Sequence, residues 1–305
     1  MNTTKNSLPT TPEELNAHFA RTLSKEGKED GLKFKPRPTD VIVSTFTKCG
    51  TTWLQQIAHG LRTRGSMEFD EINSVTPWIE LAFDLGVDLD AAQVAEPRVF
   101  KSHLSWWEVP KGARYIVSFR APEDAFISLY RFFEGFMFEP DTIDLDTLFR
   151  WRNPPAEMGE RGYWHHLASW WGQRNNPDVL LLCYEDIVED LQGTVRRVAG
   201  FMDIPLDDEL LECVVRQASR PFMLEHKDQF EERRFRQMVF ERTGIPIGET
   251  AHKVTRGAVG DPKYELSAKH HLTLEEIWQA QVTNRFGLET YAGLRNAVRE
   301  LNPAV

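Results

Sequence analysis

The sequence has few cysteines, and this scarcity narrows the kinds of site that it can carry. Cys49, Cys183 and Cys213 are the only three in 305 residues, and they lie far apart. Their spacing matches neither a metal-ligand set nor the framework of a disulfide-stapled secreted domain. We therefore expect no structural metal, no disulfide and a reducing compartment, which favours the cytoplasm.

Positive charge is also in short supply. Lysine and arginine total 36 against 46 acidic residues, so the formal net charge is −10. This balance argues against nucleic acid or an anionic membrane surface as the main partner. The net charge does not exclude a small anionic ligand, because an acidic surface can carry a local basic pocket.

Long apolar runs are absent as well. No stretch has the apolar length needed to span a bilayer, so we expect no membrane insertion. The first residues, MNTTKNSLPTTPEELN, are polar and lack the apolar core of a signal peptide. With 41% hydrophobic and 27% charged residues, the composition is typical of a globular protein with a substantial core.

The chain is organised around the stretch from Asp40 to Leu61. It opens with a short β-branched run, Val41-Ile42-Val43, typical of a buried parallel strand, and closes with an apolar helical stripe. Between them lies the turn Thr47-Lys48-Cys49-Gly50-Thr51-Thr52. A helix N-terminus presents unpaired N–H groups and a positive dipole, and a lysine adds a full charge. This pattern predicts an anion site, and an ordinary polar turn is the alternative.

Alternating strands and helices predict an α/β fold. Apolar runs predict further strands at 98–101, 115–120 and 179–184, and a proline with acidic neighbours starts a helix that runs from residue 121 to about 136. This order implies right-handed βαβ units around a central parallel sheet flanked by helices. No linker or repeat interrupts the chain, so we expect a single domain over residues 1–305.

The remaining segments are predicted from local signals. Residues 1–35 contain a capping box at Thr11 that predicts a helix towards Ser24, followed by a charged loop over 25–30. A short helix is expected over 78–83. Residues 220–263 are charged, then rich in glycine and proline, which predicts a surface segment that forms a lid or cofactor loop. Thr273 and Glu276 predict the start of the last helix.

Two further polar groups follow predicted strands. Lys101 and His103 come after the strand at 98–101, and Arg120 and Ser128 after the strand at 115–120. If these strands are parallel to the first, the groups reach the edge where open α/β sheets bind ligands. A histidine there can take a proton from a hydroxyl, and an arginine can bind phosphate. The alternative is a histidine that satisfies a backbone carbonyl and an arginine with a structural role.

The turn at Lys48 differs from the loop of nucleoside-triphosphate hydrolases, G-x-x-x-x-G-K-[ST]. It has no upstream glycine, its lysine precedes Gly50 by two residues, and no metal-binding acid ends an adjacent strand. The site is therefore expected to handle a phosphate group without a magnesium cage.

Taken together, these segments closely resemble the cytosolic sulfotransferase family. The resemblance covers most of the chain from Asp40 to about Lys263 in matching order and spacing. It implies a P-loop-like fold and transfer of a sulfuryl group from 3′-phosphoadenosine-5′-phosphosulfate (PAPS) to a hydroxyl or amine, which leaves 3′-phosphoadenosine-5′-phosphate (PAP), with no metal. The matching segments are Thr47–Trp53, Phe100–Leu104, Phe119–Ser128, Tyr184–Asp186 and Arg256–Asp261.

The resemblance also implies residue roles. His103 would be the general base, Lys101 would stabilise the transferring sulfuryl group, and Lys48 would neutralise the leaving oxygen. In-line transfer develops charge on the oxygens, so preorganised cations and N–H groups supply most of the stabilisation. The residues implied for the cofactor are Lys48, Cys49, Gly50, Thr51, Thr52, Trp53, Arg120, Ser128, Tyr184, Ser219, Met223, Arg256 and Gly257.

Several positions depart from the family pattern. Cys49 stands where a serine is usual, and its closeness to a helix N-terminus and to Lys48 predicts a lowered thiol pKa and sensitivity to oxidation. Arg220 replaces an aromatic residue and Pro262 a tryptophan. The dimerisation motif of vertebrate members is not recognisable, so the oligomeric state stays open.

The acceptor is expected to lie near His103 against aromatic side chains, which suits a flat or apolar alcohol, phenol or lipid-like molecule. Aromatic residues that fill the core are the alternative. Acidic residues such as Glu80 would instead favour a cationic acceptor. A kinase-like phosphoryl-transfer enzyme and a non-catalytic nucleotide-binding protein are the other two functions considered. The candidate acceptor contacts are Trp78, Phe83, Trp106, Trp107, Phe133, Phe136, Met137 and Phe138.

Overall fold

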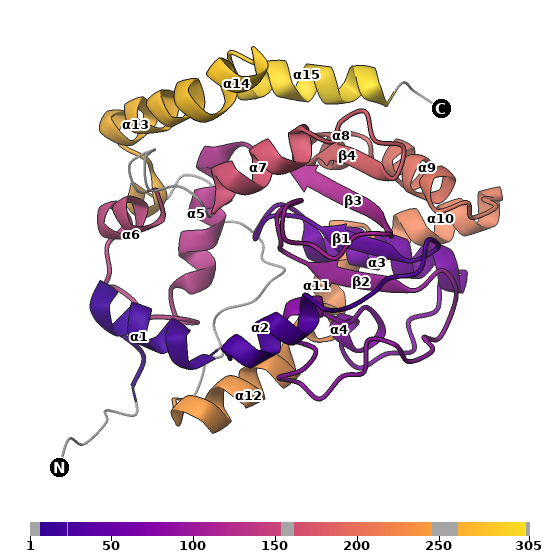
Figure 1. Cartoon of the computed structure of the whole chain (residues 1–305), viewed down its shortest axis with the longest axis horizontal. Coiled ribbons are helices and arrows are strands. Elements are labelled where there is room, and N and C mark those ends of the chain that lie inside the picture. The colour runs from indigo at the N-terminus through magenta and orange to yellow at the C-terminus, as the bar shows by residue number, and fades with distance from the viewer. Residues whose placement is uncertain (1–6, 23, 154–161, 246–261, 303–305) are drawn as a thin grey trace.

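The computed structural model describes residues 7–22, 24–153, 162–245 and 262–302, and Figure 1 shows their arrangement. Within these residues four parallel strands form one sheet in the order β2-β1-β3-β4. The predicted α/β class with a central parallel sheet is therefore confirmed. The strands are β1 (Val41–Ser44), β2 (Val99–Ser102), β3 (Arg114–Phe119) and β4 (Val179–Cys183).

The strand order reverses direction at β1. The chain leaves β1 towards β2 on one side and then crosses to β3 on the other side, so β1 lies between β2 and β3. Ser44 is in register with Ser102, and Val43 with Ile116. The loops that follow these three strands consequently meet at one edge, where ligands bind in open α/β sheets.

Helices cover both faces of this sheet. On one face, the strand residues Val41, Val43 and Ile116 share a buried cluster with Leu54 and Ile57. The helices that contribute to this face are α3 (Thr51–Thr63), α8 (Tyr184–Glu189), α9 (Leu191–Phe201) and α10 (Asp208–Gln217).

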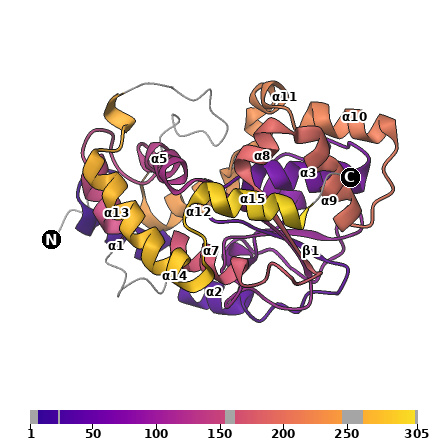
Figure 2. The ribbon, with the colours of Figure 1, turned by 90° about the horizontal axis from the view of Figure 1, so that it is seen from above.

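The second face carries the larger cluster. Ile42, Phe100 and Tyr115 point into it from the strands. Figure 2 shows the C-terminal helices α13, α14 and α15 lying one after another across the molecule. The helices packed around this cluster include α1 (Pro12–Thr22), α5 (Pro122–Phe133), α6 (Leu145–Arg152), α7 (Tyr163–Trp171), α12 (Arg233–Thr243), α13 (Ala268–Trp278), α14 (Asn284–Phe286) and α15 (Tyr291–Leu301).

The segment predicted as a charged loop over 25–30 is a helix, α2 (Lys25–Gly31). Ser24 caps it, because its hydroxyl accepts a hydrogen bond from the amide of Gly27 at 2.8 Å. Serine is a strong N-cap residue, and this local signal outweighs the two glycines inside the helix. The prediction of a loop was wrong because it weighed charge and ignored the cap.

Two predicted helix boundaries also need correction. The helix expected over 78–83 is only a 3-10 turn, η1 (Ile79–Leu81), because Trp78 pairs with Lys101 as a short extension of the sheet. The helix expected to start at Thr273 begins five residues earlier, at Ala268, and its N-cap is Ser267, whose hydroxyl accepts from the amide of His270. The chain then continues through a π-helical turn (Gln279–Thr283) into α14, and α15 is the last helix.

Residues 220–245 are helical, although the sequence predicted an irregular surface segment. They form α11 (Arg220–Glu225), a 3-10 turn (Lys227–Phe230) and α12. Glu231 and Glu232 are buried, whereas Arg233 and Arg234 are exposed, so only half of this charged run faces solvent. A short helix, α4 (Ile72–Val75), and another 3-10 turn (Pro262–Tyr264) complete the described elements, and residues 246–261 lie outside the described part.

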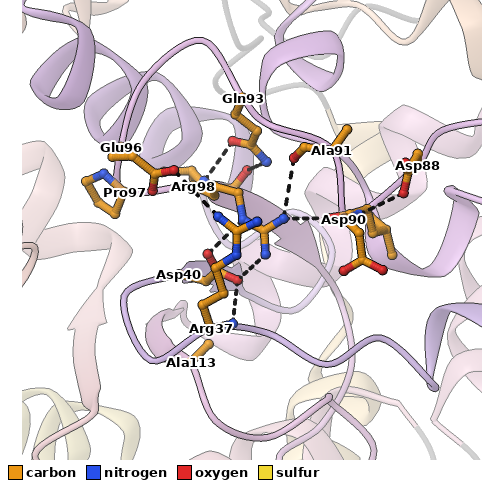
Figure 3. A network of polar contacts seen from close by, with 12 residues as sticks. Arg37, Asp40, Asp88, Asp90, Ala91, Gln93, Glu96, Pro97, Arg98 and Ala113 are labelled. Carbon is orange, nitrogen blue, oxygen red and sulfur yellow. Dashed lines mark hydrogen bonds and ion pairs between the residues drawn. The ribbon is translucent and has the colours of Figure 1, made fainter.

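A buried ion pair joins β1 and β2 at their amino ends (Figure 3). The guanidinium of Arg98 donates to both carboxylate oxygens of Asp40, at 2.9 and 2.6 Å, and neither side chain is exposed to solvent. Arg98 also donates to the carbonyl of Leu89 at 2.8 Å, and the carboxylate accepts from the amide of Arg37. Because every charge is paired, this network can be buried without an isolated ion.

None of the described helices is long and apolar enough to cross a membrane.

Candidate active site

The predicted anion loop lies at the carboxyl end of β1 and contains two residues in left-handed conformations. Lys48 has a φ of 69° and Gly50 a φ of 98°, and α3 begins at the next residue, Thr51. A side chain at Gly50 would also approach the ring of Tyr184 within 3.2 Å, so glycine is needed there. A left-handed lysine costs about 1–2 kcal/mol, and such strain is characteristic of functional loops.

The strands on either side hold this loop in place. From β2, Nδ1 of His103 donates to the carbonyl oxygen of Thr45 at 2.7 Å. From β3, the hydroxyl of Ser118 donates to the carbonyl of Cys49 at 2.6 Å, and Arg120 donates to the carbonyl of Lys48 at 3.0 Å. The loop is therefore positioned from both sides of β1.

Arg120 itself is held in an orientation that suits an anion. Its guanidinium lies 4.3 Å from the centre of the Tyr184 ring, and its backbone carbonyl accepts from the hydroxyl of Tyr163 at 2.5 Å. The Nε atom is buried and has no hydrogen-bond partner among the described residues. A buried, unpartnered N–H of a cation is costly, and a phosphate oxygen would satisfy it.

Four of the residues implied for the cofactor lie close together beside the loop. The ring of Trp53 packs edge-on against Tyr184 at 5.7 Å, and its Nε1 donates to the carbonyl of Ala218 at 2.7 Å. Ser219 follows directly and caps α11, and Met223 shares an apolar cluster with Trp53.

The other cofactor positions are less closely defined. Ser128 lies half-buried on α5. Thr51 is buried and shares a hydrogen bond with the hydroxyl of Thr45. Arg256 and Gly257 lie outside the described residues, so the structure does not place them.

His103 has the tautomer required of a base. A carbonyl oxygen can only accept, so the bond to Thr45 places the proton on Nδ1 and leaves the lone pair on Nε2. The backbone amide of His103 donates to Glu80 at 2.6 Å, and the ring packs perpendicular to Trp78 at 5.1 Å. Burial raises the pKa of Glu80, and the hydrogen bond from His103 opposes that effect.

Lys101 lies two residues before His103 and has a different polar partner. Its side chain is only 1% exposed and its ammonium forms an ion pair with Glu232. The same ammonium lies 3.4 Å from the centre of the Trp78 ring. The role predicted for Lys101 at the sulfuryl group stays a prediction, because none of these contacts involves the anion loop.

The prediction of a lowered thiol pKa at Cys49 was wrong. The side chain is fully buried, and burial raises its pKa to about 12 despite the opposing charges of Arg120 and Lys48. Loss of solvation disfavours the thiolate more than nearby cations favour it. The sequence shows the neighbouring positive charges but does not show that the thiol of Cys49 is buried.

An arc of aromatic rings connects the anion loop with His103. The ammonium of Lys48 lies 4.4 Å from the centre of the Phe132 ring. Phe132 stacks on Phe136 at 4.7 Å, Phe136 on Phe235 at 6.1 Å, and Phe235 packs against Trp78 at 5.9 Å. We call these four residues the aromatic arc. It ends where Trp78 contacts His103.

Of the eight predicted acceptor contacts, Trp78 packs against His103 and Phe136 belongs to the aromatic arc. Met137 is buried in the larger cluster. Phe83 and Trp107 are 54% and 53% exposed, on the outside of the molecule. Phe133 and Phe138 are buried in the larger cluster. Trp106 packs edge-on against Tyr115 and Trp170. None of these contacts tests the binding of an acceptor, so the roles predicted for these residues stay predictions.

The sequence did not single out Phe132, Phe235, Glu232 and Ser118 as functional candidates. Ser118 had a usable signal, because it lies two residues before Arg120 and side chains alternate along a strand. Phe132 and Phe136 are four residues apart, the spacing of one helical face, although α5 ends at Phe133. Nothing local indicated that Glu232 would be buried.

Comparison with known proteins identifies the family. The sequence model of the Sulfotransferase domain matches residues 38–287, which is most of the chain. This chain belongs to the Sulfotransferase domain family.

Related sulfotransferases extend over similar lengths. The amine sulfotransferase of Oryctolagus cuniculus is 27% identical over 259 residues, which cover 82% of each protein. The 3-alpha-hydroxysteroid sulfotransferase of Cavia porcellus is 28% identical over 263 residues, which cover 82% of this chain and 86% of the relative.

Solved structures show the same fold. Retinol dehydratase superposes with a TM-score of 0.66 at 18% identity and covers 85% of each chain. Mouse sulfotransferase SULT7A1 has a TM-score of 0.64 at 17% identity and covers 92% of this chain and 94% of its own. The anion loop, His103 and Arg120 all lie within the stretch that matches the Sulfotransferase domain.

Proposed function

We propose that this protein is a PAPS-dependent sulfotransferase that acts on a hydroxyl or amine of a small apolar or aromatic acceptor. The observation that carries the proposal is the hydrogen bond from His103 to Thr45, at 2.7 Å. It joins a histidine with a basic Nε2 to the loop that carries Lys48. Membership of the Sulfotransferase domain family supports the same reaction.

The residues present fit the cofactor. The N-terminus of α3 follows the strained loop, and Lys48 supplies a positive charge there. Arg120 offers a buried N–H that has no partner within the described part of the chain. Trp53 and Tyr184 provide aromatic surface beside them. Two fold neighbours, retinol dehydratase and mouse SULT7A1, have structures with PAP, which supports the same class of cofactor here.

In this proposal PAPS supplies the sulfuryl group, and the chain supplies charge and a base. Lys48 and the backbone N–H groups from Gly50 to Thr52 stabilise negative charge that develops on the leaving phosphate. His103 removes the acceptor proton at Nε2. The resulting imidazolium keeps its Nδ1–H bond to Thr45, so proton uptake requires no movement of the ring.

The aromatic arc supports an apolar acceptor. Its four rings link Lys48 to His103 through successive ring contacts, and in-line transfer would place the acceptor oxygen between these two residues. The relatives include a hydroxysteroid sulfotransferase and an amine sulfotransferase, so both hydroxyl and amine acceptors are proposed. A location in the cytoplasm and a single domain over 1–305 belong to the same proposal.

The test compares ligands and then turnover. Calorimetry should show that PAP binds more tightly than ATP, and labelled PAPS should transfer its sulfuryl group to phenols, sterols or arylamines in the presence of a chelator. Tight ATP binding with magnesium-dependent turnover would favour the kinase-like alternative. PAP binding without transfer to any acceptor would favour a non-catalytic nucleotide-binding protein.

A further inference from the structure

The backbone around Arg120 is held by side chains from other parts of the fold. Arg120 and Ala121 lie between the end of β3 and the start of α5, outside both elements. The carbonyl of Arg120 accepts from the hydroxyl of Tyr163 at 2.5 Å, and the amide of Ala121 donates to the carboxylate of Glu185 at 3.1 Å. Glu185 therefore fixes the peptide that directly follows the arginine.

Glu185 has a second partner on the C-terminal helix. The hydroxyl of Tyr291, the first residue of α15, donates to the other carboxylate oxygen of Glu185 at 2.5 Å. Burial raises the pKa of Tyr291, and the charge of Glu185 adds to that effect, so the hydroxyl keeps its proton near neutral pH. Asp186 accepts from Arg295 of α15 at 2.8 Å. The first turn of α8 is thus tied to α15 at two points.

The same turn of α8 also contacts the guanidinium of Arg120. The helix begins at Tyr184, and the centre of the Tyr184 ring lies 4.3 Å from that guanidinium. Glu185 is the next residue, so one carboxylate sits between the arginine and α15. A carboxylate that accepts from two donors on different elements keeps one position, because any shift loses one of two charge-assisted hydrogen bonds.

We propose that Glu185 and Tyr291 are positioning residues for Arg120, and that α15 thereby sets the affinity for the cofactor. The inference rests on the proposed function, in which Arg120 binds PAPS. Both residues act through the backbone at Ala121 and the start of α8, and neither needs to touch the cofactor. Tyr291 lies beyond residues 38–287, the stretch that matches the Sulfotransferase domain, so this contact is not part of that match.

The main experiment is calorimetric titration with PAP. Tyr291→Phe keeps the ring and removes only the hydroxyl, and it should weaken PAP binding roughly three- to tenfold, the usual cost of ordering one long side chain on binding. Glu185→Ala removes both hydrogen bonds and should weaken binding by about tenfold or more. Glu185→Gln can still accept from Ala121 and should recover part of this loss. In turnover, the KM for PAPS should rise in the same proportion, with kcat and the acceptor KM within about twofold of the wild type.

A control variant and a double variant separate positioning from a general loss of stability. Tyr115→Phe also removes one tyrosine hydroxyl, which donates to Pro110 near the amino end of β3, and it should bind PAP as the wild type does. If Tyr291 acts through Arg120, the effect of Tyr291→Phe on PAP affinity should nearly vanish in the Arg120→Ala background. An effect of the same size in both backgrounds would overturn the proposal.

Equal PAP affinity of Tyr291→Phe and the wild type would overturn it as well. If Glu185→Ala fails to fold, Tyr291→Phe and Glu185→Gln still decide the question. A wild type that binds PAP and transfers no sulfuryl group contradicts the proposed function alone, because the calorimetric comparison still tests Tyr291. A wild type that binds no PAP overturns both.

Discussion

Nδ1 of His103 lies 2.7 Å from the carbonyl oxygen of Thr45, and this one contact joins the end of β2 to the loop that follows β1. The contact does two things at once. It fixes the proton on Nδ1, so that Nε2 is the basic nitrogen, and it braces the backbone ahead of Lys48. This contact therefore holds His103 beside the anion loop.

His103→Ala should lower kcat by about 10²- to 10⁴-fold, the usual contribution of a general base, while PAP still binds. Because alanine also removes the brace at Thr45, His103→Asn is the matched variant: its side-chain amide can donate to the same carbonyl without acting as a base. Single-turnover kinetics and calorimetry measure the two effects. Near-normal turnover in either variant would remove the role assigned to His103.

Arg120→Ala should weaken PAP binding roughly 10- to 100-fold, because hydrogen bonds to charged groups contribute about 1.5–3 kcal/mol. Arg120→Lys should recover part of this loss, since it keeps the charge but not the fork. Calorimetric titration with PAP is the measurement. Arg150→Ala removes an exposed arginine of α6 and should bind PAP as the wild type does. Equal affinity in Arg120→Ala would show that the buried Nε does not face the cofactor.

Cys49 should be inert to oxidation. With its pKa raised to about 12 by burial, almost none of the thiol is thiolate near neutral pH, and the thiolate is the reactive form. Treatment with peroxide should leave wild type and Cys49→Ser equally active. Thiol labelling of the folded protein should be confined to the half-buried Cys213 and should vanish in Cys213→Ser. Peroxide inactivation of the wild type that Cys49→Ser abolishes would contradict this expectation.

The sequence predicted the parts of the site that depend on local signals. The loop at Lys48, the strand that ends at Arg120 and the position of His103 follow from short motifs at strand ends. The orientation of Lys101, the burial of Glu232 and the aromatic arc could not be predicted, because they arise where α5, α12 and β2 meet in space. Cys49 shows the same limit, since the sign of its pKa shift depends on burial.

His59 should make stability depend on pH. Burial lowers its pKa to about 3, and the neighbouring Arg62, which donates to its Nδ1 at 3.2 Å, adds to that effect. In the unfolded chain the pKa of His59 has its ordinary value of 6.5, so below that pH the unfolded chain binds more protons than the folded chain. The contribution of neutral His59 to the free energy of unfolding is therefore complete above pH 6.5 and is lost as the pH falls towards 3.

The free energy of unfolding of the wild type should therefore fall by roughly 2 kcal/mol more than that of His59→Gln between pH 6.5 and 5, at about 1.4 kcal/mol per pH unit. Urea denaturation at several pH values measures the free energy of unfolding. The exposed His271 gives the control, because His271→Gln should follow the wild type. Identical pH profiles for wild type and His59→Gln would refute the assignment.

The ion pair between Asp40 and Arg98 has a consequence for how this protein can change. It closes the amino ends of β1 and β2, whereas the anion loop and His103 occupy the carboxyl ends of the same strands. The buried ion pair and the candidate site thus lie at opposite ends of two four-residue strands. Substitutions at the carboxyl edge are therefore expected to leave the alignment of β1 and β2 intact, because the ion pair that joins the two strands lies at the other end.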